Sequence, residues 1–200
     1  MPRQQRSPTG GHANFYINNC GDFRSLPPRQ ATPEETNMQT RQVNMQRWSI
    51  VSHKPFDAVV AAVEAAIGRP NMGEFAAKMA AAQNYEEMQT VVRGSISEIG
   101  LMEFMRLDQG AVLAKAGVDS DPKSVRLIMG NPLIMQSMAR LVPDAGSYAP
   151  VTVLIDQRPD GVHLGYDEMA SFLAPYGNAD ALRIARDLDA KVKRVLESAS

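Results

Sequence analysis

The sequence has few of the residues that disulfide and metal chemistry require. Its 200 residues include one cysteine, Cys20, so no disulfide can form within the chain. Such cysteine usage fits a reducing compartment, and a cytoplasmic location is expected. His12, His53 and His163 are scattered along the chain and, with Cys20, match no metal-ligand spacing. We therefore expect neither a metal site nor a bound cofactor.

Long apolar runs and an excess of one charge are also missing. No stretch approaches the roughly 20 apolar residues that cross a bilayer, and no hydrophobic segment follows the basic N-terminus. Neither a membrane span nor a secretory signal is expected. Lys and Arg number 21 against 22 Asp and Glu, which gives a formal net charge of −1. Nucleic acid is not an expected partner, because proteins that bind it usually carry a basic excess.

The first part of the chain differs in composition from the rest. Residues 1–40 are rich in Pro, Gly, Asn, Gln and Arg and show little apolar periodicity, which predicts a flexible N-terminal arm. Phe15, Tyr16 and Phe23 leave open an arm that docks on its own domain or on a partner. Residues 41–200 are expected to form a single domain, since this length can bury a core without disulfides or metals.

Apolar periodicity within residues 41–200 predicts alternating strands and helices. Asp160 and Gly161, after a proline, predict the turn of an antiparallel hairpin. The pattern as a whole indicates an α+β fold, a two-layer domain with a mixed sheet of about five strands and helices mainly on one face. The expected strands are 45–51, 101–107, 125–129, 150–156 and 161–166, and the expected helices are 55–67, 73–83, 84–99, 111–116, 132–141, 167–174 and 179–198.

Several motifs in this order resemble a known family. A strand and turn cover Met102–Gly110, an apolar strand ends in Gly130-Asn131-Pro132-Leu133, and Pro150–Leu154 leads into the hairpin that ends at Tyr166. Residues 45–198 resemble the domain of unknown function 302 family of mostly bacterial proteins, although the helical segment near 70–90 is longer than expected for it. The resemblance implies a compact α+β domain that associates as a dimer, and it implies no established reaction.

Two polar residues at strand ends are the best candidates for a site. Asn131 precedes Pro132 and suits a helix N-cap, where free N–H groups favour an anion. Asp108 ends an earlier strand, and if the two strands are parallel neighbours, both side chains lie over one end of the sheet. Met135 and Tyr148 would line an apolar wall beside them. The predicted ligand-binding residues are therefore Asp108, Asn131, Met135 and Tyr148, although Asp108 and Asn131 could equally serve only as helix caps.

The sequence shows no established catalytic motif. It has no Gly-x-Ser-x-Gly elbow, no phosphate-binding loop and no dinucleotide fingerprint. His163 alternates with Val162 and Leu164, so it is expected to point away from the core, without a nucleophile partner in any recognisable motif. The leading hypothesis is a non-enzymatic module that binds a small molecule or a protein and self-associates as a homodimer. The alternative is an enzyme of unassigned reaction with a site near Asp108 and Asn131.

Overall fold

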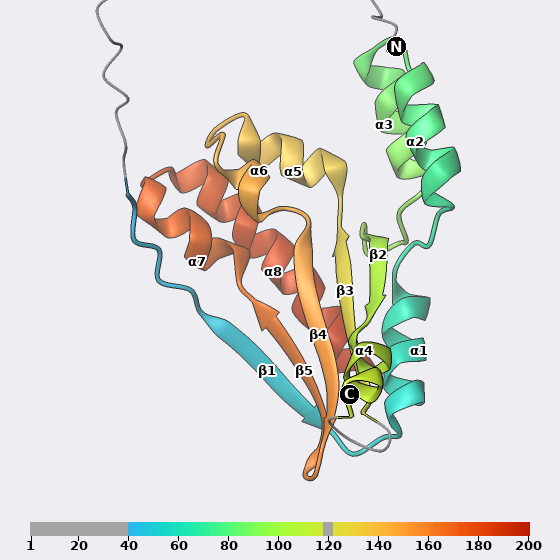
Figure 1. Cartoon of the computed structure of the whole chain (residues 1–200). Coiled ribbons are helices and arrows are strands. Elements are labelled where there is room, and N and C mark those ends of the chain that lie inside the picture. The colour runs from blue at the N-terminus through green and yellow to red at the C-terminus, as the bar shows by residue number, and fades with distance from the viewer. Residues whose placement is uncertain (1–39, 118–121) are drawn as a thin grey trace, which may run out of the picture. The chain divides into compact units, whose positions relative to one another are not determined.

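The computed structural model of the protein describes residues 40–117 and 122–200. The arm expected over residues 1–40 lies outside the described residues, except for Thr40. Contacts along the chain place the boundary between two units at Thr40 and Arg41. Within residues 41–200, a five-stranded sheet and a set of helices give the expected α+β fold (Figure 1).

The sheet is antiparallel throughout, in the order β1-β5-β4-β3-β2. The expectation of five strands is confirmed, and the hairpin between β4 and β5 forms as predicted. The expectation that the sheet is mixed is wrong, because every neighbouring pair of strands runs in opposite directions. The strands are β1 (Arg47–Ser52), β2 (Met102–Asp108), β3 (Ser124–Gly130), β4 (Val151–Arg158) and β5 (Gly161–Asp167).

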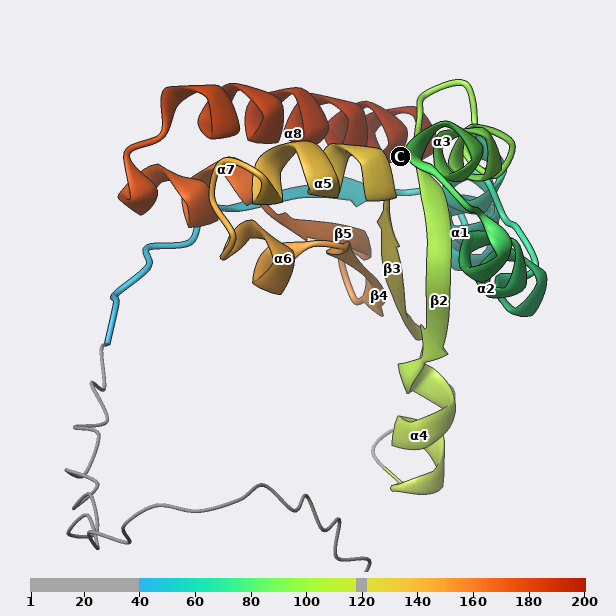
Figure 2. The same cartoon turned by 90° about the horizontal axis from the view of Figure 1, so that it is seen from above.

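The connections between strands explain why neighbouring strands are antiparallel. Two parallel neighbours would require a crossover that carries the chain back along the length of the sheet. Helix α4 (Gln109–Lys115) follows β2 but projects from the end of the sheet, away from the main helical layer (Figure 2). The chain therefore enters β3 at the end where β2 stopped. Helices α5 (Pro132–Ala139) and α6 (Ala145–Tyr148) return it in the same way from β3 to β4.

One face of the sheet carries the helical layer (Figure 2). Helices α1 (Phe56–Ala66) and α8 (Ala179–Ala199) pack on alternate side chains of the strands, together with α5 and α7 (Met169–Leu173). A short 3₁₀ turn, Ala174–Tyr176, follows α7. The period-two burial of β4 and β5 shows that these strands are apolar on the helical side only. The buried apolar residues of β3, β4 and β5 on this side are Val125, Leu127, Met129, Val151, Val153, Ile155, Val162, Leu164 and Tyr166.

Helices α2 (Met72–Ala81) and α3 (Tyr85–Arg93) form a hairpin beside β2. They bury Phe75 and Val92 against Met102 in a small apolar cluster of their own. The helix expected over 84–99 ends at Arg93, because Gly94 caps it and weakens its continuation.

Candidate binding site on the open face of the sheet

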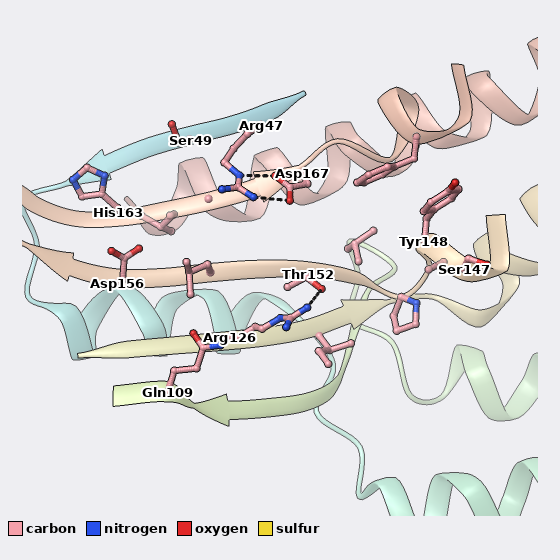
Figure 3. Close-up of a pocket in the computed structure, with 18 of the residues that line it drawn as sticks. Arg47, Ser49, Gln109, Arg126, Ser147, Tyr148, Thr152, Asp156, His163 and Asp167 are labelled. Atoms are coloured by element: carbon pink, nitrogen blue, oxygen red, sulfur yellow. Dashed lines mark hydrogen bonds and ion pairs between the residues drawn. The ribbon is translucent and has the colours of Figure 1, made fainter. Parts of the chain in front are cut away.

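The face of the sheet opposite the helical layer borders a cavity of about 840 Å³. Strands β1, β5, β4 and β3 form its floor (Figure 3). Tyr148 of α6 and Phe172 of α7 stand at one end, and Gln109 at the start of α4 lines the other side. This surface, called the open face below, consists of the strand residues that alternate with the buried ones. The sheet therefore positions a broad, partly polar surface that the core does not need.

Gly165 leaves a depression in the middle of the open face. It pairs with Ser49 of β1 and with Leu154 of β4, and a Cβ atom built on it would meet no described heavy atom within 4 Å. Its φ lies outside the left-handed region, so the backbone does not require glycine here. Glycine inside a strand costs about 0.5–1 kcal/mol of stability. Strand glycines mark bulges, tight bends or sites where a ligand or another backbone approaches closely, and the pairing of Gly165 is regular on both sides.

Two arginines of the open face are paired with aspartates. Arg47 donates from Nε and Nη2 to the two carboxylate oxygens of Asp167, at 2.6 and 2.8 Å (Figure 3). Arg158 donates in the same way to Asp156, at 2.6 and 3.3 Å. Hydrogen bonds to these carboxylates raise the pKa of both arginines above the usual value. Each of the two guanidinium charges is therefore neutralised by a partner on the same face.

Arg126 is different, because it forms no ion pair with any described residue. Its Nη2 donates one long hydrogen bond, 3.4 Å, to Thr152 Oγ1, and the close-up shows the side chain directed toward that hydroxyl (Figure 3). Leu107 and Leu154 are its cross-strand neighbours on either side. Among the residues that the structure describes, the open face thus holds one guanidinium without a counter-charge, and its nearest neighbours across the strands are apolar.

Aromatic side chains close one end of the open face. The rings of Tyr148 and Phe172 stack with centroids 4.9 Å apart and planes 9° apart. The Tyr148 hydroxyl lies 3.0 Å from the Tyr176 hydroxyl, and this hydrogen bond raises the pKa of Tyr176. The guanidinium of Arg41 lies 4.2 Å from the centre of the Tyr176 ring. The predicted residue Tyr148 therefore belongs to an aromatic wall.

His163 lines the open face, on the side of β5 away from the core, as its alternation predicts. Its Nε2 lies 2.8 Å from Asp160 Oδ1, and this hydrogen bond lowers the pKa of Asp160. In residues 40–117 and 122–200, no group of three or more His, Cys, Asp or Glu side chains could hold a metal ion. Over the same residues, no helix has the length and apolar character needed to span a membrane.

Asp108 and Asn131 do not meet, which corrects the expected site. Asp108 pairs with Val125 near the start of β3, whereas Asn131 follows the last residue of that strand. Because β2 and β3 are antiparallel, the two side chains lie at opposite ends of the sheet. Each caps a helix: Asp108 Oδ1 accepts from the Ala111 N–H at 2.9 Å, and Asn131 Oδ1 accepts from the Leu133 N–H at 2.8 Å.

Asn131 and Met135 do lie together, in a second and smaller cavity of about 230 Å³. Asn131 Nδ2 donates to the Gly100 carbonyl at 2.9 Å, so both ends of its amide are engaged with the backbone. The cavity is otherwise apolar, and it shares the wall 149–151 with the cavity of the open face. The four predicted residues are therefore divided among three places, and ligand binding by any of them stays a prediction.

Sequence reasoning missed Arg126 and Gly165 as site residues. Arg126 is the one polar residue in the otherwise apolar strand expected at 125–129, and Gly165 interrupts the second strand of the hairpin. Both departures from the strand pattern were visible signals. Whether these residues form part of a site depends on which strands lie beside them. The residue pattern of a single strand does not reveal its neighbours.

The comparisons with known proteins agree with this fold. A family model described as "Domain of unknown function DUF302" matches residues 77–199. None of the curated proteins matches the chain. Among solved structures, the crystal structure of an uncharacterized conserved DUF302 protein from Bacillus stearothermophilus is similar, with a TM-score of 0.55 at 10% identity, covering 77% of this chain and 98% of that chain. That likeness shows the fold. Because the family model matches more than half of the sequence, the chain belongs to the family of the domain of unknown function DUF302.

Proposed function

We propose that this domain is a non-enzymatic binding module whose small-molecule ligand lies on the open face of the sheet. The observation that carries the proposal is the unfilled depression at Gly165, in the floor of a cavity of about 840 Å³. Ligand sites are usually concave, with apolar walls and a few polar groups that orient the ligand. Ile128, Leu154 and Phe172 supply apolar lining, and Arg126 and Thr152 supply polar groups.

The polar groups of the open face support binding rather than catalysis. Catalytic acids and bases usually lie in a cleft and have shifted pKa values. Here the buried groups with raised pKa values are Tyr166 of β5 and Asp189 of α8, whose side chains meet on the helical side of the sheet, away from the open face. The enzyme alternative relied on Asp108 and Asn131, which lie at opposite ends of the sheet, each with its side chain engaged in capping a helix. Family membership supplies no reaction that would change this preference.

Mass spectrometry of the protein purified under native conditions from its host tests the proposal. We expect small molecules to accompany the wild-type protein and to be lost from Gly165→Val, because the valine side chain fills the depression. Gly146→Ala is the matched control: its added methyl group also meets no described atom within 4 Å, but it lies outside the cavity lining. Equal recovery from all three proteins, or no small molecule with the wild type, would contradict a ligand on the open face.

A second candidate partner is another copy of the same chain. Edge strand β2 and helix α4 expose a group of large apolar side chains, Met105, Leu107, Val112 and Leu113. Exposed apolar edge strands favour pairing between chains, which supports the homodimer expected from the sequence. A cytoplasmic location and the lack of a nucleic-acid partner stay predictions of the composition.

A further inference from the structure

Resting on the proposed function, we infer that the ligand of the open face is an amphipathic organic anion. Its acid group pairs with Arg126, and its apolar body covers the side chains that surround this guanidinium.

Within residues 40–117 and 122–200, the arginine and aspartate charges of the open face leave one positive group uncompensated. Three arginines and two aspartates line the cavity. Arg47 and Arg158 each hold an aspartate through two hydrogen bonds, so the remaining charge is that of Arg126. A guanidinium binds carboxylate and phosphate groups through two parallel N–H donors. Apart from the long bond to Thr152 Oγ1, the guanidinium of Arg126 makes no hydrogen bond with a described residue.

The surroundings of Arg126 select against a small hydrophilic anion. Leu154 flanks it across β4, and Ile128 follows it on the same face of β3. Both residues line the cavity together with the guanidinium. The charge therefore lies beside two apolar side chains. A ligand that matches both features must carry an acid group on an apolar body.

Thr152 helps to orient the charged group. It pairs with Ile128 across β3 and β4, so its hydroxyl lies on the open face beside Arg126. An acid group at Arg126 lies within reach of the same hydroxyl, which can donate to an anion instead of accepting from the guanidinium. The depression at Gly165 lies across Leu154 from Arg126 and leaves room for the apolar body.

Isothermal titration calorimetry with three probes tests the ligand class. Naphthoate carries both features, naphthalenemethanol is its uncharged counterpart, and inorganic phosphate has charge without an apolar body. We expect naphthoate to bind most tightly, and Arg126→Gln to weaken it by about tenfold, the effect of losing one charge-assisted pair. Arg126→Lys should lie between the two. Arg186→Gln makes the same charge change at an exposed position of α8 and should leave binding unchanged.

Gly165→Val separates failure of this inference from failure of the proposed function. If naphthalenemethanol binds as well as naphthoate, and Arg126→Gln changes neither while Gly165→Val abolishes both, the open face binds ligands but the anion class is wrong. Absence of naphthoate binding, or tighter binding of inorganic phosphate, also overturns the inference. The proposed function is decided separately, by the molecules that accompany the native protein.

Discussion

The hydroxyl of Tyr166 in β5 donates a 2.6 Å hydrogen bond to the carboxylate of Asp189 in α8, and both residues are buried. The same carboxylate accepts from the backbone N–H groups of Met169 and Ala170, at 2.8 and 3.0 Å, at the start of α7. The side chain of Glu168, at the N-cap position, makes no capping hydrogen bond. A residue of α8 therefore caps α7 and also ties it to the sheet.

Replacing Asp189 should destabilise the domain. In Asp189→Asn, the amide can accept through only one of its two terminal atoms, so at least one buried N–H or hydroxyl loses its acceptor. The expected loss is about 2 kcal/mol of unfolding free energy, against about 1 kcal/mol for Tyr166→Phe, which removes a single donor. Urea denaturation of the three proteins measures both differences. Unfolding midpoints indistinguishable from the wild type would contradict a structural role for the carboxylate.

The stabilising effect of Asp189 should depend on pH. Burial raises the pKa of Asp189 above its usual value, against the opposing effect of its hydrogen-bond donors. The folded chain then holds this proton more tightly than the unfolded chain, so the contribution is full below the usual aspartate pKa and is lost as pH rises through the raised pKa. The difference in unfolding free energy between wild type and Asp189→Asn should shrink as pH rises. A difference that grows instead would show that the donors outweigh burial.

Valine should have opposite effects at two glycines of β5. At Gly165 there is open space above an extended strand, and valine favours strands, so Gly165→Val should stabilise the domain by about 0.5–1 kcal/mol. At Gly161 the φ is 143°, and a Cβ would lie 2.7 Å from the Ser52 carbonyl oxygen, so Gly161→Val should destabilise it. Thermal unfolding followed by circular dichroism compares the two. A lower melting temperature for Gly165→Val would mean that the depression is not open.

Loss of the two helix caps should have unequal effects. Asn131→Ala removes the cap of α5 and the hydrogen bond to the Gly100 carbonyl, and should cost about 1–2 kcal/mol. Asp108→Ala removes only the cap of α4, which buries Gly110 alone, so the loss should be smaller. Chemical denaturation of both variants measures the difference. Equal losses would show that α4 contributes more to stability than its packing indicates.

The chain should form a homodimer through β2 and α4. Light scattering at micromolar concentration should give about twice the chain mass of 21.9 kDa. Met105→Lys should shift the protein toward the monomer, because it places a charge in the exposed apolar group. Val51→Lys is the control, since Val51 is 40% exposed on β1, at the other edge of the sheet. A monomer mass for the wild type, or dissociation by Val51→Lys alone, would contradict this interface.

The elements of the fold could be predicted from local patterns, but the neighbours of each strand could not. Periodicity located every strand to within a few residues. The turn at Asp160-Gly161 predicted the hairpin of β4 and β5, which the pairing of these two strands confirms. Helix α6 was missed because it is one short turn that contains Gly146. The direction of a strand depends on the end of the sheet at which the preceding connection delivers the chain. The alternation of strands and helices in the sequence gave no sign that α4 would project from the sheet.

The same limit applies to the candidate site. Capping is a local property, so the caps at Asn131 and Asp108 were foreseeable from the residues that follow them. Their predicted meeting failed because it required a parallel pair. The depression at Gly165 depends on Ser49 and Leu154, which come from two other strands, and it becomes visible only when the register of all three is known.

The alternation along β4 separates two kinds of constraint on a single strand. Val153 and Ile155 are fixed by close packing under the helices, whereas Thr152 and Leu154 face outward, where their identity has little effect on the core. Substitutions at the outward positions can therefore change the chemistry of this surface without repacking the interior. Chains with this fold can keep the same interior and still differ on this face, so a shared fold carries little information about what the face contacts.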